Sequence, residues 1–143
     1  MNNLEKPTTL IGRILLGHIF VMAGISKLGA GYAATQGWMD AMSVPGILLP
    51  AVILLEIGAG AALILGLQTR LAAAALAGFS IISALIFHSN LADQMQMILF
   101  MKNFTMAGGL LFVVAFGAGA WSLDGRRSAK THRTQHAASA SLG

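Results

Sequence analysis

The chain has 143 residues, of which 56% are hydrophobic and only 10% are charged. Soluble domains carry about a quarter charged residues, so this composition indicates a membrane protein. The chain has no cysteine, which excludes disulfides, thiol catalysis, thiolate metal sites and iron-sulfur clusters. The net charge of +4 is concentrated near the C-terminus, where it suits a topology signal and anionic lipid headgroups better than nucleic acid.

The first apolar run spans about residues 10–28 and is predicted to be a membrane helix. Arg13 and His18 interrupt this run, which is also longer than the core of a usual signal peptide, so we expect it to be retained. Arg13 and Lys27 lie near its opposite ends, from which long basic side chains can extend to the headgroups.

A loop rich in glycine and alanine follows the first run. Its Tyr32 and Trp38 favour headgroup depth, so we expect a short surface helix over about residues 33–42.

The second membrane helix is predicted over about residues 46–67, and its middle carries Glu56. A carboxylate at that depth costs at least a few kcal/mol when it faces lipid, so it should face protein or a water-filled cavity. Ala59 and Gly60 lie on the same side of this helix, and small residues let a neighbouring backbone approach closely.

Two further membrane helices are predicted over about residues 71–88 and 98–121, which makes the fold an all-α four-helix membrane bundle within residues 1–124. The turn before the third helix is so short that this helix should run antiparallel beside the second. Residues 125–143 form a basic tail that is expected to be disordered.

Lysine and arginine are distributed unevenly between the two sides of such a bundle. One side collects both termini and the turn at residues 68–70, and the other has Lys27 and Lys102. The positive-inside rule therefore places both termini in the cytoplasm. The residues interpreted as structural or topological are Arg13, Arg70, Arg126 and Arg127.

His18 and Glu56 are the candidate catalytic residues. Counted along the helices, His18 lies about 12 Å from the inner edge and Glu56 about 15 Å from the outer edge of a slab about 30 Å thick, so their depths nearly match. A carboxylate beside an imidazole can hold a proton or bind a quinone oxygen. The alternative is a structural pair that locks two helices together.

A second group of polar residues falls at the outer ends of the helices, and these are candidates for ligand binding. Two cations, an imidazole and an amide on one mouth would suit an anionic or quinone-like ligand, although each cation could instead anchor its own helix in the headgroups. The group consists of Lys27, His88, Lys102 and Asn103.

No metal site is expected. Several methionines lie on the outer side and thioethers select monovalent copper, but methionine also fills gaps in apolar surfaces, and no histidine pair or cysteine supports a site. The chain has no phosphate-binding loop, zinc-protease motif or nucleophile elbow.

Short motifs occur in a fixed order between Arg13 and Asp124: Arg13-x-x-x-Gly17, Gly24-Ile25-Ser26-Lys27, Val44-Pro45-Gly46, Leu54-Leu55-Glu56-x-Gly58-x-Gly60, Thr69-Arg70, Phe87-His88-Ser89-Asn90, Met101-Lys102-Asn103, Gly108-Gly109 and Ser122-Leu123-Asp124. This ordered series resembles the DoxX family. The resemblance implies a four-helix protein of the bacterial plasma membrane, of a kind described as oxidoreductases or quinol-oxidase-associated subunits and linked to thiosulfate:quinone oxidoreduction. A histidine at position 18 is not part of the family pattern.

Two functions stay open. The chain is either a redox subunit that binds a quinone or small phenolic substrate around Glu56, or a non-catalytic scaffold that assembles a membrane enzyme complex. A small transporter is a third and less favoured interpretation, because four helices could line a path only as an oligomer or for very small solutes. The expected surroundings are the lipid bilayer and either further copies of the chain or a membrane redox complex.

Overall fold

The computed structural model describes residues 4–140, and the side chains of residues 4–131. This part of the chain contains helices and no strands. The elements in order are α1 (Glu5–Ser26), α2 (Ala30–Ala41), the 3-10 turn η1 (Gly46–Leu48), α3 (Leu49–Leu65), α4 (Thr69–Phe87), α5 (Gln94–Phe116) and α6 (Leu123–Ala140).

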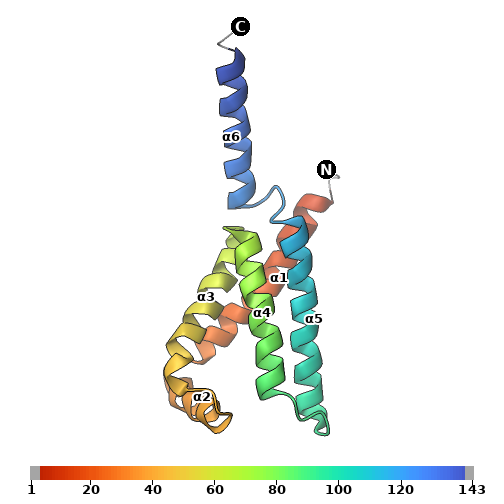
Figure 1. The fold of residues 1–143 in the computed structure, drawn as a ribbon. Coiled ribbons are helices and arrows are strands. Elements are labelled where there is room, and N and C mark those ends of the chain that lie inside the picture. The colour runs from red at the N-terminus through yellow and green to blue at the C-terminus, as the bar shows by residue number, and fades with distance from the viewer. Residues whose placement is uncertain (1–3, 141–143) are drawn as a thin grey trace.

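Four of the described segments are long and apolar enough to cross a membrane: α1, η1 with α3, α4 and α5. Figure 1 shows them as one bundle, with α2 lying across one end and α6 projecting from the other, the end at which α1 also begins. The predicted four-helix membrane bundle is confirmed, and the short surface helix appears as α2. The predicted orientation, with both termini in the cytoplasm, stays a prediction.

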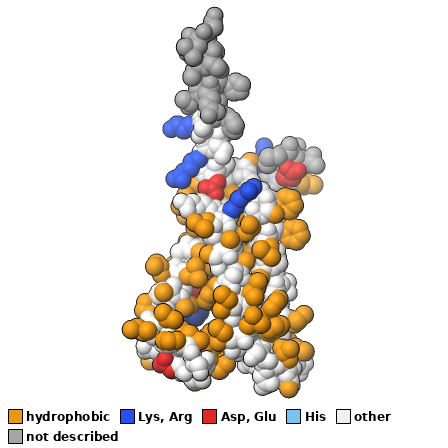
Figure 2. Space-filling model, viewed as in Figure 1, with side chains coloured by type: hydrophobic (Ala, Val, Ile, Leu, Met, Phe, Trp, Pro, Cys, Tyr) orange, Lys and Arg blue, Asp and Glu red, His pale blue; other side chains and the backbone are white. Residues whose placement is uncertain are grey.

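The bundle consists of two tightly packed helix pairs. α1 packs along α3, and α4 packs along α5, while the pairs meet mainly between α3 and α4. The shared core includes Phe20, Leu63, Leu76 and Leu110. Large apolar side chains cover most of the outer surface, and the basic side chains gather at the end where α6 begins (Figure 2). This distribution suits an apolar belt in lipid with a polar end in water.

Glycine allows α1 and α3 to approach closely. A Cβ atom on Gly17 would lie 2.7 Å from the carbonyl oxygen of Gly60, and a Cβ on Gly60 would lie 2.9 Å from the carbonyl oxygen of Gly17. Both distances are shorter than van der Waals contact allows, so these positions require glycine as long as the helices keep this spacing. The small-residue face predicted around Gly60 is therefore the face on which α1 packs.

Arg13 does not extend to the headgroups, and that expectation is wrong. Its side chain is 1% exposed and donates to the carbonyl oxygens of Leu63 and Ile64, at 3.3 Å each, and to that of Trp121. Carbonyls at a helix C-terminus lack partners within the helix, and a guanidinium can satisfy several of them at once. Arg13 thus closes the end of α3 and holds the segment that leads to α6.

Asp124 caps the next helix in the same region. Its carboxylate accepts hydrogen bonds from the backbone N–H groups of Gln68 and Thr69 and from the Thr69 hydroxyl, at 2.8 to 2.9 Å. Burial raises the pKa of Asp124, but the hydrogen bonds from Thr69 and Gln68 and the charge of Arg127 outweigh it, so the pKa lies below its ordinary value of 3.8. A carboxylate at a helix N-terminus is also favoured by the helix dipole.

Helix boundaries differ from the predicted ones most clearly at the start of α1, which begins at Glu5, at both ends of α5 and in the tail. The last membrane helix is α5, which begins at Gln94 because Asp93 caps it by accepting from Gln96 N–H, and which ends before Gly117, whose φ is 83°. The tail expected to be disordered contains α6 up to Ala140. Its alanine, arginine, lysine and glutamine are good helix formers, which accounts for a helix without an apolar face. Residues 141–143 lie outside the described part.

Candidate functional site

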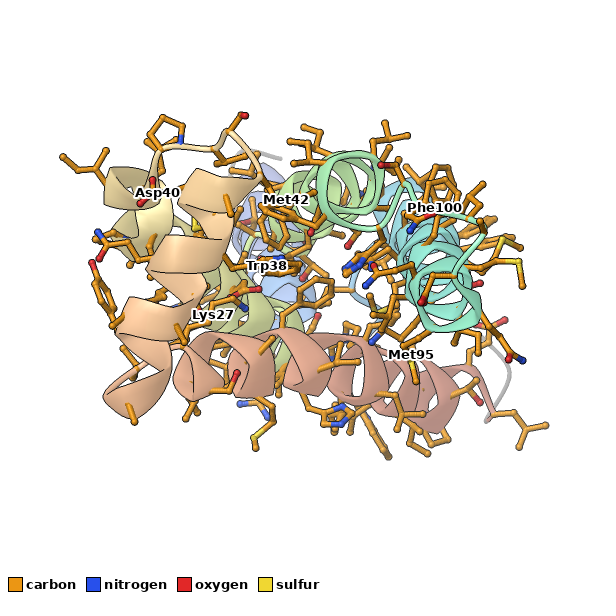
Figure 3. The ribbon with its side chains drawn as sticks, turned by 90° about the horizontal axis from the view of Figure 1, so that it is seen from below. Lys27, Trp38, Asp40, Met42, Met95 and Phe100 are labelled. Carbon is orange, nitrogen blue, oxygen red and sulfur yellow. The ribbon has the colours of Figure 1, made fainter. Side chains whose placement is uncertain are left out.

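The bundle contains a cavity of about 390 Å³ at the end covered by α2. Its walls are formed mainly by apolar side chains, and the aromatic ones come from three helices: Phe20 of α1, Trp38 of α2, and Phe79 and Phe87 of α4. In Figure 3, which looks along the bundle from this end, Trp38 and Lys27 both point into the space between the helices. A hollow of this size can hold a small ring-shaped molecule.

An ion pair lies on the wall of this cavity. Lys27 Nζ lies 2.8 Å from Oε1 and 2.8 Å from Oε2 of Glu56, and it also donates to the Ala23 carbonyl oxygen at 3.1 Å. The Glu56 residue is 3% exposed. Lys27 therefore turns inward to neutralise a buried carboxylate, so its predicted position among the headgroups is wrong.

The other outer polar residues lie on the same cavity wall. His88 follows α4, and Lys102 and Asn103 belong to α5. His88 Nδ1 is 2.8 Å from Gln96 Oε1, a contact that links the end of α4 to the start of α5. Asn103 Nδ2 donates to the Leu99 carbonyl oxygen at 2.8 Å, and Lys102 is exposed. The structure thus brings together the four ligand-binding candidates predicted from sequence, and it adds Glu56 to them.

Helix α2 covers this end of the cavity through two side chains. The ring of Trp38 lies 4.8 Å from that of Phe87 and 6.0 Å from that of His88, measured between ring centroids. Met39 is 4% exposed and packs with Leu49 and Ile53 of α3. α2 is therefore part of the site and more than a surface anchor.

His18 does not belong to the site. It lies on the exposed face of α1, and its Nδ1 is 2.9 Å from the Leu15 carbonyl oxygen of the same helix. The predicted pairing of His18 with Glu56 is wrong, because matching depth along two helices does not fix the direction in which each side chain points. Lys27 takes the place expected for His18 beside Glu56.

Comparison with known proteins identifies the family. The sequence matches the DoxX family over residues 8–89. It is also 47% identical over 124 residues to the inner membrane protein YqjF of Escherichia coli K12, a match that covers 87% of this chain and 95% of YqjF. This chain belongs to the DoxX family.

A second relative supports membership of the DoxX family, and the membrane-spanning helices support the localisation. The inner membrane protein YphA of Escherichia coli K12 is 33% identical over 124 residues, which cover 82% of this chain and 88% of YphA. Both relatives are named as inner membrane proteins, and four described segments can span a membrane, so the predicted localisation as a multi-pass inner-membrane protein is confirmed. No solved structure matches the chain.

The DoxX match covers only part of the cavity wall. Residues 8–89 include Lys27, Glu56 and His88, whereas Lys102 and Asn103 follow the matched segment. The ion pair and the aromatic side chains of α1, α2 and α4 thus lie within the family region, and α5 supplies the remaining wall.

Several residues of the site were not predicted from this DoxX sequence. Gln96 and Phe79 gave no signal beyond their polar and apolar character, and Phe87 was noted only as part of the stretch Phe87-His88-Ser89-Asn90 that resembles the family. The pattern of Asp93 followed three residues later by Gln96 could have indicated a helix start, because it resembles a capping box. Arg70, Arg126 and Arg127 are exposed at the opposite end, in keeping with a topological role.

Proposed function

We propose that this protein binds a quinone or a small phenolic molecule in the cavity under α2, as the ligand-binding subunit of a membrane redox system. The observation that carries the proposal is the cavity itself: about 390 Å³, walled by four aromatic side chains, with a buried ion pair on one side. Apolar walls with a few placed polar groups are typical of sites for small organic ligands. The aromatic rings suit a flat ligand, and the polar groups suit its oxygen atoms.

The electrons in such a system would come from a partner. The chain has no cysteine, and no group of three or more metal-ligating side chains is found among the described residues. The bundle would therefore bind and orient the ring and supply hydrogen bonds, while a second protein of the membrane, or a further copy of the chain, completes the assembly.

The test is a titration with duroquinone followed by tryptophan fluorescence in mild detergent. Trp38 lines the cavity and Trp121 lies at the opposite end of the bundle, so a Trp121→Phe variant reports on the cavity alone and a Trp38→Phe variant is its control. We expect saturable quenching in Trp121→Phe, and only weak, unsaturable quenching in Trp38→Phe. An extract of the purified protein in organic solvent is analysed for bound quinone in parallel.

A blocking variant shows whether the quenching arises inside the cavity. Ser83 of α4 lines the cavity, and Ala75 of the same helix faces outward, so Ser83→Leu and Ala75→Leu are matched substitutions. We expect Ser83→Leu to raise the duroquinone concentration needed for half-maximal quenching at least tenfold. Ala75→Leu should leave that concentration unchanged. Equal quenching in both variants would contradict a site in the cavity.

The alternative function is a scaffold for membrane enzymes, and one observation favours it. Lys27 and Glu56 neutralise each other and link α1 to α3, as a purely structural pair would. In that case duroquinone does not quench Trp38 saturably. Glu56→Gln would then reduce the size of the assembly extracted from membranes in mild detergent.

A further inference from the structure

Three of the side chains that line the cavity are also exposed at the surface of the bundle. Trp38 is 45% exposed at the end covered by α2, Ile82 of α4 is 57% exposed, and Lys102 is exposed on α5. The cavity wall therefore reaches the surface at three places. Trp38 carries a polar N–H and Lys102 a charge, so Ile82 is the one of these three side chains that is wholly apolar.

Helices α3 and α4 both contribute to the cavity wall but separate toward α2. α3 supplies Val52 and Glu56 to the wall, and α4 supplies Phe79, Ile82 and Ser83 among others. Figure 1 shows the two helices close together at their connecting turn and apart at the end near α2. Figure 2 shows basic and acidic side-chain atoms between α3 and α4, within an otherwise apolar part of the surface. This is expected where a wall that carries an ion pair is open, so the cavity opens sideways between these helices.

This side opening lies at the depth of the lipid hydrocarbon. Both helices belong to segments that are long and apolar enough to cross a membrane, and Ile82 lies about 8 Å before the end of α4 at Phe87. A molecule that enters here comes from the lipid and does not cross water. A hydrocarbon chain attached to it can remain in the lipid while its ring occupies the cavity, because lipid tails are as apolar as the aliphatic side chain at the opening.

We infer that the cavity takes a ring that carries a long apolar chain, and that this chain leaves between α3 and α4, past Ile82, into the bilayer. The polar groups of the wall and most of its aromatic side chains surround the ring, and a cavity of about 390 Å³ leaves the chain to extend outside. The ligand is thus a lipid-soluble quinone or phenol that arrives through the membrane. The inference rests on the proposed function, because it assumes a ring in this cavity, and it adds the chain of the ligand and its route of entry.

The first experiment compares duroquinone with an analogue in which a decyl chain replaces one methyl group. Both are titrated against the Trp121→Phe protein in mild detergent, and their partitioning into empty micelles is measured, so that affinities refer to the concentration within the micelle. The chain lies among detergent tails in the free and in the bound state, so we expect the two affinities to agree within about threefold. A cavity closed at its side would exclude the chain, and the decyl analogue would then bind at least about tenfold more weakly.

A substitution at the opening tests the route of the chain. Ile82→Phe places a larger side chain in the opening, and we expect it to weaken the decyl analogue at least about tenfold more than it weakens duroquinone. Leu85→Phe on the same helix is the matched control, because Leu85 is also exposed, at 54%, but does not line the cavity. It should change neither affinity.

A photoreactive chain shows where the chain leaves without any substitution. A diazirine at the end of the decyl chain is activated in lipid nanodiscs, and the labelled peptides are identified by mass spectrometry. We expect labelling of α3 and α4 that an excess of duroquinone removes. Labelling of α1 and α5 that duroquinone removes would place the exit on the side of Lys102 and overturn the inference.

The outcomes separate this inference from the proposed function. If duroquinone quenches Trp38 saturably but the decyl analogue is rejected, a ring binds in the cavity and the inference is wrong. If Ile82→Phe weakens both ligands equally, the chain does not pass Ile82 and the inference is wrong again. If neither ligand binds, both the inference and the proposed function are wrong. The photolabelling decides the route in the unmodified protein even if Ile82→Phe fails to fold.

Discussion

Lys27 and Glu56 differ in how easily each charge can reach water when its partner is removed. Glu56 lies inside α3 and is buried, whereas Lys27 directly follows the end of α1 and is only partly buried. A lysine near a helix end can extend its flexible side chain to the headgroups if its partner is removed. The shorter side chain of Glu56 cannot reach the headgroups, because α3 continues for more than one turn on both sides of it.

This asymmetry predicts the outcome of a double-mutant cycle. Lys27→Met leaves a buried carboxylate without its cation and should destabilise the protein by about 3 to 5 kcal/mol. Glu56→Met should cost clearly less, and the double variant should be close to the wild type, because it removes both charges together. Thermal unfolding in detergent, followed by circular dichroism, measures all four proteins. Lys102→Met, on the exposed rim lysine, is the control and should change little.

Equal losses from the two single substitutions would contradict this account of the pair. So would a double variant that is as unstable as Lys27→Met, since that would make the lysine stem, rather than its charge, the source of stability.

The lowered pKa of Asp124 predicts how the free energy of unfolding depends on pH. Its pKa is lowered in the folded protein, so its contribution is fully present above the unfolded pKa of about 3.8 and is lost as the pH falls through the folded value. Asp124→Ala should cost about 1 kcal/mol at pH 7. The gap in unfolding free energy between wild type and Asp124→Ala should become smaller below about pH 4. At that pH the wild-type carboxylate becomes protonated and no longer caps α4.

Thermal unfolding in detergent at pH 7, 5 and 3 measures this gap. Glu5→Ala is the comparison, because Glu5 makes no such cap for α4. A gap of constant size over this range would show that the carboxylate charge of Asp124 does not contribute.

At the scale of the helices, the contact between α1 and α3 depends on glycine. Gly60→Ala places a methyl group 2.9 Å from the Gly17 carbonyl oxygen and 3.0 Å from Val21 Cγ2, so the two helices must separate. We expect a loss of about 1 to 3 kcal/mol, as for other overpacked interiors. Gly58→Ala on the same helix is the control, because a Cβ there meets nothing within 4 Å. It should be neutral or slightly stabilising.

Thermal unfolding of the two variants checks this prediction. If both alanines have the same effect, the close approach at Gly60 does not limit the spacing of the helices.

The sequence was most informative about whole helices and least about side-chain direction. Apolar length predicted the four spans, and the carboxylate at Glu56 predicted a buried polar point, because both follow from the cost of polar groups in lipid. Position along the helices, however, led to two wrong predictions, a pairing of Glu56 with His18 and an Arg13 side chain among the headgroups. Which face of α1 meets α3 depends on the glycine contact, and that contact becomes clear only once the helices are packed.

At the scale of the whole molecule, the two ends of the bundle differ in chemistry. One end has the start of α1, the α3–α4 turn and α6, with Arg70, Arg126 and Arg127 exposed. The other end has α2, the cavity and the loop between α4 and α5, where the aromatic and polar residues of the site gather. The basic end should lie in the cytoplasm, which places the cavity toward the outer side of the inner membrane.

Single cysteines can test this orientation, because the chain has none of its own. Asn90→Cys lies in the loop between α4 and α5, and Ser128→Cys lies on α6; both positions are exposed. In cells with a permeabilised outer membrane and an intact inner membrane, a membrane-impermeant maleimide should label Asn90→Cys. It should label Ser128→Cys only after lysis. The reverse pattern would place the termini outside and the cavity at the cytoplasmic side, so the ligand would then have to reach the site from the inner leaflet.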